Sequence, residues 1–107
     1  MTESRIRYSD VRPYVVADSL EELTGPTTGV VELPRRLDWS EQGTYDLDDI
    51  RELRVLYEVV LRESMNADDL RIFIDGATLR DVWRDLFLPR RVRAMWEKQF
   101  PPLAESA

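Results

Sequence analysis

Apolar residues recur at helical spacing between residues 47 and 61, and this run constrains the fold more than any other feature of the sequence. Its members are three or four positions apart, with charged side chains between them: Leu47, Ile50, Leu53, Leu56, Tyr57, Val60 and Leu61. Such a period is typical of an amphipathic helix with one face in the core. Because Val55 and Val59 widen the apolar surface, we expect a central helix of about five turns that packs on more than one side. The carboxylates within 45–49 predict its start, since acidic residues cap helices and complement the helix dipole.

Three shorter helices are predicted after the central one. Asn66 is a good N-cap, and the apolar residues that follow indicate a helix over 68–74 that Gly76 ends. Pro89 suits the first turn of the last helix, where its missing N–H is harmless. The helix between them is expected over 78–86, because four apolar residues share one face there: Leu79, Val82, Trp83 and Leu86.

The N-terminal quarter of the chain has weaker signals. Ser19 and Glu22 have the spacing of a capping box and predict one short helix. The β-branched run over 28–33, between a Gly-Pro turn signal and a proline, predicts a strand. Either residues 13–17 or residues 36–39 are expected to pair with that strand.

Together these signals predict a mainly α fold with a minor β part: four C-terminal helices, an N-terminal extended arm and a short two-stranded sheet. With 107 residues, the chain has the size of a single domain. We expect an arm over 1–27 that includes the short helix, one compact domain over 28–104, and a frayed tail over 105–107. The tail follows Phe100-Pro101-Pro102, which stops the last helix because proline disfavours helix in the residue before it.

The sequence contains neither histidine nor cysteine. The commonest metal ligand, the usual general base near neutral pH and the thiolate nucleophile are therefore missing. The four scattered glycines form no phosphate-binding loop. We predict a protein that is not an enzyme and needs no cofactor or metal. The acidic pairs Asp48-Asp49 and Asp68-Asp69 precede helices, so capping explains them better than Mg²⁺ binding.

The charge of the chain is unevenly distributed. Residues 1–70 carry 8 basic and 16 acidic side chains, residues 71–107 carry 7 and 5, and the net charge is −6. Such a chain does not attract nucleic acid as a whole, so contact with it would have to come from the C-terminal part. The sequence shows no signal-peptide pattern and no stretch of membrane-spanning length, and its lack of cysteine fits a reducing compartment. A cytoplasmic protein without membrane contact is predicted.

Arg90, Arg91 and Arg93 form the most suggestive cluster for DNA binding. The helix over 78–86, a tight turn and the helix from Pro89 have the outline of a helix-turn-helix, whose second helix enters the major groove. A solvated helix face explains the cluster better, because three acidic residues nearby dilute it: Asp81, Asp85 and Glu97. DNA contact through the three arginines is the second hypothesis for this chain.

The tryptophans are of two kinds. Trp83 and Trp96 lie on apolar helical stripes and are predicted core residues. Trp39 follows Asp38 and precedes a polar loop, so it either closes the core or anchors a partner, a role in which tryptophan is favoured. The candidate partner-binding residues are therefore Trp39, Tyr45, Arg90, Arg91 and Arg93.

Several short motifs resemble those of a group of small uncharacterised actinobacterial proteins. The resemblance covers about residues 25–104 and is carried by these strings: Val31-Glu32-Leu33-Pro34, Leu37-Asp38-Trp39-Ser40, Tyr45-Asp46-Leu47-Asp48-Asp49, Leu56-Tyr57-Glu58, Leu61-Arg62-Glu63, Asp68-Asp69-Leu70, Leu88-Pro89, Val92-Arg93, Trp96-Glu97 and Phe100-Pro101. Members of the group are often encoded beside a nucleotidyltransferase-type toxin of the abortive-infection class. The resemblance implies an antitoxin that binds and masks such a toxin, its acidic N-terminal part covering a basic nucleotide pocket.

Three classes of function remain open. The first is a non-enzymatic protein-binding module of the antitoxin kind, and the second is a DNA-binding transcriptional regulator that uses the last two helices. The third is a structural or dimerising protein, which is favoured if Val55 and Val59 face a second copy of the chain. The salt dependence of binding distinguishes the first two classes. DNA binding weakens steeply with added salt, whereas masking by an apolar and aromatic surface depends less on it.

Overall fold

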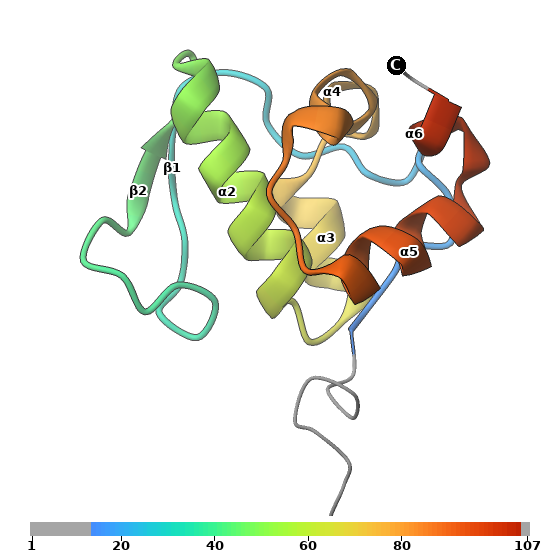
Figure 1. The fold of residues 1–107 in the computed structure, drawn as a ribbon. Coiled ribbons are helices and arrows are strands. Elements are labelled where there is room, and N and C mark those ends of the chain that lie inside the picture. Colours follow the sequence, from blue (N-terminus) through green and yellow to red (C-terminus); the bar gives the residue numbers. More distant parts are fainter. Residues whose placement is uncertain (1–13, 106–107) are drawn as a thin grey trace, which may run out of the picture.

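One central helix, α2 (Ile50–Glu63), organises the fold in the computed structural model, which describes residues 14–105 (Figure 1). Asp49 caps its N-terminus by accepting a hydrogen bond from the backbone N–H of Arg51. The predicted central amphipathic helix is confirmed, although its 14 residues make about four turns rather than five. Its side chains are buried in the core on more than one side: Leu53, Leu56, Tyr57, Val59, Val60 and Leu61.

A hairpin of two strands, β1 (Val30–Glu32) and β2 (Thr44–Asp46), lies beside α2 (Figure 1). The strands are antiparallel, with Val31 opposite Tyr45. The expected strand within 28–33 is therefore confirmed, but both expected partners are wrong. The chain from Pro34 curls into a turn instead, because the N–H groups of Leu37 and Asp38 both donate to its carbonyl.

Two further predictions for this part of the chain also differ from the structure. Residues 14–17 lie outside the sheet, while Pro13 lies outside the described residues. Residues 45–46, at which the central helix was predicted to begin, lie in strand β2. Gly43 directly before it has a φ of 68°, a left-handed conformation that glycine adopts without strain and that lets the chain turn back along β1.

Four further helices and a 3₁₀ turn complete the described chain: α3 (Ala67–Phe73), α4 (Gly76–Val82), η2 (Trp83–Asp85), α5 (Arg90–Gln99) and α6 (Pro101–Glu105). Asn66 caps α3 as predicted, since its side chain accepts a hydrogen bond from the N–H of Asp69. Gly76 does not end α3. It begins α4 instead, because Asp75 caps that helix by accepting a hydrogen bond from the N–H of Thr78.

The segment over 14–28 crosses the molecule from α5 and α6 to the hairpin (Figure 1). Ser19 N–H donates to the Glu22 carboxylate, which is one half of a capping box, yet residues 19–22 form a turn and no helix. The predicted short helix is wrong because the chain just beyond pairs with residues 74–76. Thr24 bridges Asp75 in antiparallel fashion, and the N–H of Gly76 donates to the Leu23 carbonyl at 2.9 Å.

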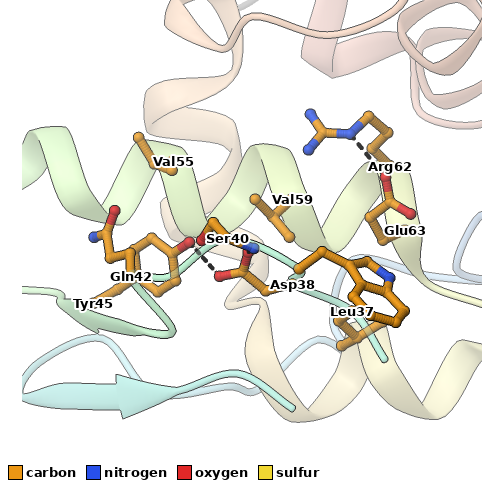
Figure 2. Close-up of a pocket in the computed structure, with 10 residues that line it drawn as sticks. Leu37, Asp38, Ser40, Gln42, Tyr45, Val55, Val59, Arg62 and Glu63 are labelled. Carbon is orange, nitrogen blue, oxygen red and sulfur yellow. Dashed lines mark hydrogen bonds and ion pairs between the residues drawn. The ribbon is translucent and has the colours of Figure 1, made fainter. Parts of the chain in front are cut away.

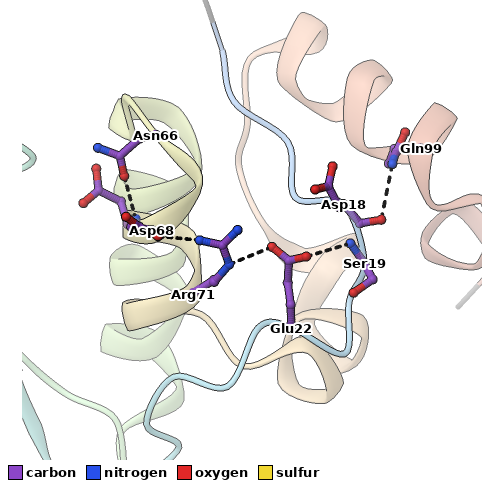
Figure 3. A network of polar contacts seen from close by, with 8 residues as sticks. Asp18, Ser19, Glu22, Asn66, Asp68, Arg71 and Gln99 are labelled. Carbon is purple, nitrogen blue, oxygen red and sulfur yellow. Dashed lines mark hydrogen bonds and ion pairs between the residues drawn. The ribbon is translucent and has the colours of Figure 1, made fainter.

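Polar contacts also tie this segment to the helices (Figure 3). Arg71 of α3 donates to Glu22 at 3.0 Å and pairs with Asp68 as well. Gln99 of α5 donates to the carbonyl of Asp18. The N-terminal segment is thus held at α3 and at α5, and its residues Ala17 and Leu23 are part of the same core as the helices.

The C-terminal part of the core is aromatic. The Trp96 ring lies 6.4 Å from the Trp83 ring and 5.6 Å from the Phe100 ring, centroid to centroid, in tilted arrangements. Both tryptophans are buried, as predicted. The last long helix ends before Pro101 as expected, but a short helix follows it. Leu103 in that helix is 1% exposed, and the helix reaches Glu105, the first residue of the predicted tail, while 106–107 lie outside the described residues.

The predicted mainly α fold with a minor two-stranded sheet is confirmed. Across residues 14–105, no helix has both the length and the apolar character that crossing a membrane requires.

Candidate functional site

A groove of about 310 Å³ opens between the loop that joins the two strands and one face of α2 (Figure 2). The side chains of Val55, Val59, Arg62 and Glu63 line it from the helix. From the loop and the start of β2 it is lined by Leu37, Asp38, Trp39, Ser40, Gln42 and Tyr45. The register of the hairpin sets this geometry, because it returns the chain past α2 at Tyr45 and leaves the loop bulging over the helix.

Asp38 and Tyr45 form the polar part of the groove. The Tyr45 hydroxyl donates a hydrogen bond of 2.5 Å to one carboxylate oxygen of Asp38, and the N–H of Ser40 donates to the other oxygen at 2.9 Å. Asp38 is 6% exposed and Tyr45 is 1% exposed, so both residues are buried. This contact fixes the loop to the strand and thereby sets the position of Trp39.

Neither of these two groups changes its charge near neutral pH. Burial raises the pKa of Asp38, but hydrogen bonds from Tyr45 and Ser40 outweigh it and leave that pKa below the ordinary value. Burial, followed by the hydrogen bond to Asp38, raises the pKa of Tyr45 to about 12. The carboxylate therefore stays ionised and the phenol stays protonated, which suits them to structural support rather than to proton transfer.

Trp39 is the exposed wall of the groove. It is 77% exposed, an unusual state for a large aromatic side chain, and the guanidinium of Arg35 lies 5.8 Å from its ring centroid. On the opposite wall Val55 is 39% exposed, whereas Val59 is nearly buried. Apolar surface on both sides of the groove is thus open to solvent.

The rim of the groove carries charge. Arg62 donates to the carboxylate of Glu63 at 3.0 Å, and both side chains are about one third exposed. With Asp38 below them, the groove has two carboxylates and one guanidinium. Its electrostatic character is therefore mildly acidic, in line with the net charge of the chain.

The structure brings only two of the five predicted partner-binding residues to this groove. Trp39 is exposed there, whereas the ring of Tyr45 is buried and its hydroxyl is bonded to Asp38. The three arginines lie on α5. The guanidinium of Arg93 donates to the carbonyls of Trp83 and Leu86 and lies 5.0 Å from the Trp83 ring centroid. Its positive charge is thus used to fasten α5 to η2.

The other two arginines of the cluster differ from Arg93. Arg91 lies with its guanidinium 5.9 Å from the ring of Tyr14, and Arg90 is exposed at the first turn of α5. The helix-turn-helix outline therefore has at most two outward basic side chains at the start of its second helix. Whether they touch DNA stays a prediction.

The acidic pairs have separate roles. Asp49 caps α2, as predicted, but Asp69 is a buried partner of Arg36. The spacing of 33 residues between Arg36 and Asp69 gave no signal for this ion pair in the sequence. Among residues 14–105, no three acidic side chains gather where they could hold a metal ion.

Comparison of the chain with protein-family models, with curated proteins and with solved structures finds no match.

Proposed function

We propose that this protein is a non-enzymatic protein-binding module whose partner docks at the groove between Trp39 and α2. The observation that carries the proposal is the exposure of Trp39 beside a groove with a second apolar wall. A tryptophan at an interface buries a large area with little loss of side-chain entropy, and such residues dominate binding energies. A preformed loop lowers the cost further, since the bond between Asp38 and Tyr45 has already fixed it.

The partner segment that fits this groove is apolar with basic flanks. An apolar side chain inserted between Trp39 and Val55 would lose contact with water on both sides. Basic side chains of the partner would meet the carboxylate of Glu63 at the rim and the acidic surface of the chain as a whole. Charge complementarity of this kind mainly raises the association rate and selects against acidic partners.

The resemblance to the actinobacterial group supports a more specific partner. On that basis we propose an antitoxin role, in which the chain masks a nucleotidyltransferase-type toxin encoded by the neighbouring gene. Such a toxin needs a basic pocket for the phosphates of its nucleotide, which matches the acidic character of this chain. Masking requires no active site on the antitoxin.

Co-expression of the chain with the product of its neighbouring gene tests this proposal. We expect the two proteins to purify as a complex and the chain to relieve growth arrest caused by its neighbour. The change Trp39→Ala should weaken the complex by about 2 kcal/mol or more, as at interface hot spots. Phe87→Ala is the matched control, because Phe87 is 84% exposed but does not line the groove.

Two results would contradict the proposal. If the pair does not purify together and the neighbour arrests no growth, the antitoxin role is lost. If instead Trp39→Ala changes the sedimentation of the chain alone from dimer to monomer, the groove is a contact between copies of this chain and the third class of function replaces the first.

A further inference from the structure

We propose that the outer edge of β1 is a second binding surface, which takes up an extended segment of another protein as a third strand, with a basic and a β-branched residue two positions apart on one face of that segment. This proposal goes beyond the docking groove and does not depend on it. It concerns the backbone of Val30 and Glu32 rather than the side chains around Trp39.

The register of the hairpin shows which backbone groups point outward. Leu47 N–H donates to the Gly29 carbonyl and Leu33 N–H donates to the Gly43 carbonyl, each at 2.8 Å, and Val31 lies opposite Tyr45 between them. Because alternate residues of an antiparallel strand bond to the same neighbour, the N–H and C=O groups of Val30 and Glu32 point away from β2. This edge therefore presents two donors and two acceptors at strand spacing.

The outer edge of β2 is blocked, in contrast to that of β1. The N–H of Asp46 donates to the Glu52 side chain at 2.8 Å, and the Thr44 carbonyl accepts from the side chain of Gln42 at 3.2 Å. Native proteins commonly protect edge strands with such contacts, because open edges pair with other chains. Only one of the two edges is protected here.

The edge of β1 lacks comparable protection. Within residues 14–105, no side chain or loop donates to or accepts from the outward groups of Val30 and Glu32. Val30 is 72% exposed and its neighbours on both the strand and the preceding turn are exposed or half-buried. Figure 1 shows the hairpin at the side of the molecule away from α5 and α6, so the helices of the C-terminal part do not cover it.

Charge and side-chain shape select the kind of strand that fits. The solvent face of the hairpin carries Val30 and Glu32 from β1, with Asp46 opposite Val30. The nearest basic side chains on the loop are already engaged, since Arg36 pairs with Asp69 and Arg35 lies over Trp39. Because Val30 and Glu32 share this face, a partner strand with lysine or arginine beside Glu32 and a β-branched residue beside Val30 carries the two residues two positions apart, and cross-strand pairing favours both neighbours. Main-chain bonds would supply affinity, as in other cases of strand addition.

A second copy of this chain is a poorer occupant than such a segment. Two copies would bring together two chains of net charge −6, each with Glu32 and Asp46 on the same face of the sheet. Repulsion between like charges opposes that pairing.

Hydrogen exchange measured by NMR on the full chain tests the proposal, with a short peptide that carries lysine and valine two positions apart, separated by threonine, as the probe. In the free protein we expect fast exchange at the amides of Val30 and Glu32 and slower exchange at Val31. The peptide should slow exchange at the two outward amides selectively. The same peptide with glutamate in place of each lysine should not slow it.

Variants of Glu32 distinguish the contribution of its backbone N–H to peptide binding from that of its carboxylate charge. Glu32→Pro removes an outward N–H while leaving the inward bonds of Val31, so it should abolish the protection of Val30. Glu32→Lys should weaken peptide binding about three- to tenfold, whereas Glu41→Lys, an exposed loop position, should leave it nearly unchanged. Glu32→Lys keeps the proposal testable even if the proline variant does not fold.

Three outcomes would overturn the proposal. The first is no protection of Val30 and Glu32 at millimolar peptide, and the second is peptide-induced shifts confined to the Trp39 groove. The third is protection that rises with the concentration of the chain alone, which would assign the edge to a second copy. The change Trp39→Ala should leave edge binding intact, so the failure of this proposal and that of the docking groove are distinguishable.

Discussion

Arg36 and Asp69 form a two-point ion pair that fastens the loop after β1 to the first turn of α3. The two nitrogens Nη1 and Nη2 donate to the two carboxylate oxygens at 2.9 and 2.7 Å. The side chain of Asp69 is 2% exposed and that of Arg36 is 55% exposed, so a buried carboxylate is paired with a guanidinium on its solvent side. The hydrogen bond from Arg36 holds the pKa of Asp69 below its usual range.

Loss of the Asp69 charge should destabilise the protein and flatten its response to acid. Since the folded-state pKa lies below the unfolded-state value, the stabilisation is complete above the ordinary carboxyl pKa of about 4 and is lost as the pH falls below it and through the lower folded-state pKa. We expect Asp69→Asn to lower the free energy of unfolding at pH 7 by about 1 to 3 kcal/mol. Urea unfolding between pH 7 and pH 3 measures both effects. Asp48→Asn, at an exposed position, is the control, and equal acid profiles for the two variants would refute the assignment.

Tyr45 should control stability at alkaline pH. Its folded-state pKa of about 12 exceeds the ordinary value near 10, so its contribution is complete below pH 10 and is lost as the pH rises from 10 towards 12. The tyrosinate absorbance of the folded protein should therefore contain a component that titrates near pH 12 and is missing in Tyr45→Phe. If the spectra of the two proteins titrate alike, Tyr45 is not the residue with the raised pKa.

Substitution of Gly76 by alanine should destabilise the chain although the residue lies in a helix. A Cβ at this position would collide with the backbone carbonyl of Leu20, which packs against the start of α4. Overpacking of this kind costs about 1 to 3 kcal/mol and outweighs the helix propensity that alanine adds. Thermal or urea unfolding measures the effect. Asp81→Ala, at an exposed position on the same helix, should change stability by less than about 0.5 kcal/mol.

Arg93 and Arg90 should respond differently to substitution by alanine. Arg93→Ala removes the hydrogen bonds to the carbonyls of Trp83 and Leu86 and should cost about 1 to 2 kcal/mol of stability. Arg90→Ala should leave stability within about 0.5 kcal/mol of the original, because Arg90 is exposed. Binding to duplex DNA that falls steeply with salt and falls further in Arg90→Ala would support the DNA-binding hypothesis instead of the masking one.

The short C-terminal helix α6 should contribute to the stability of the whole core. Leu103 is buried beside Phe100, and α6 contacts both α5 and η2. We expect Leu103→Ala to cost about 2 to 4 kcal/mol, as for other leucines in a packed core. Glu105→Ala is the control, since Glu105 is exposed on the same helix. Equal unfolding midpoints for the two variants would show that α6 does not pack on the core.

The features that sequence predicted correctly are those with a local physical cause. The period of the central helix, the cap at Asn66 and the stop before Pro101 each depend on residues within a few positions of one another. Residues 45–46 were misread because Asp46, Asp48 and Asp49 all resemble helix caps. Only Asp49 is one, and the pairing of Tyr45 with Val31 takes the preceding residues into the sheet.

The candidate site was predictable only in part. Trp39 has a local signal, a tryptophan between an acidic residue and a polar loop, and it is exposed at the groove. The support beneath it has no such signal. Asp38 and Tyr45 meet only because a hairpin folds between them, and Arg36 finds Asp69 only once α3 is packed. Contacts of this kind depend on tertiary structure that periodicity and spacing do not describe.

The pairing of residues 23–25 with residues 74–76 has a consequence for synthesis of the protein on the ribosome. Leu23 is covered in the finished fold, but its backbone partners are translated about fifty residues later, which takes several seconds at ordinary elongation rates. During that time the nascent N-terminal segment has no native site to occupy. Native burial of Leu23 must therefore wait until α3 and the start of α4 have left the ribosomal tunnel, so this earlier-made segment is secured only after the later-made one.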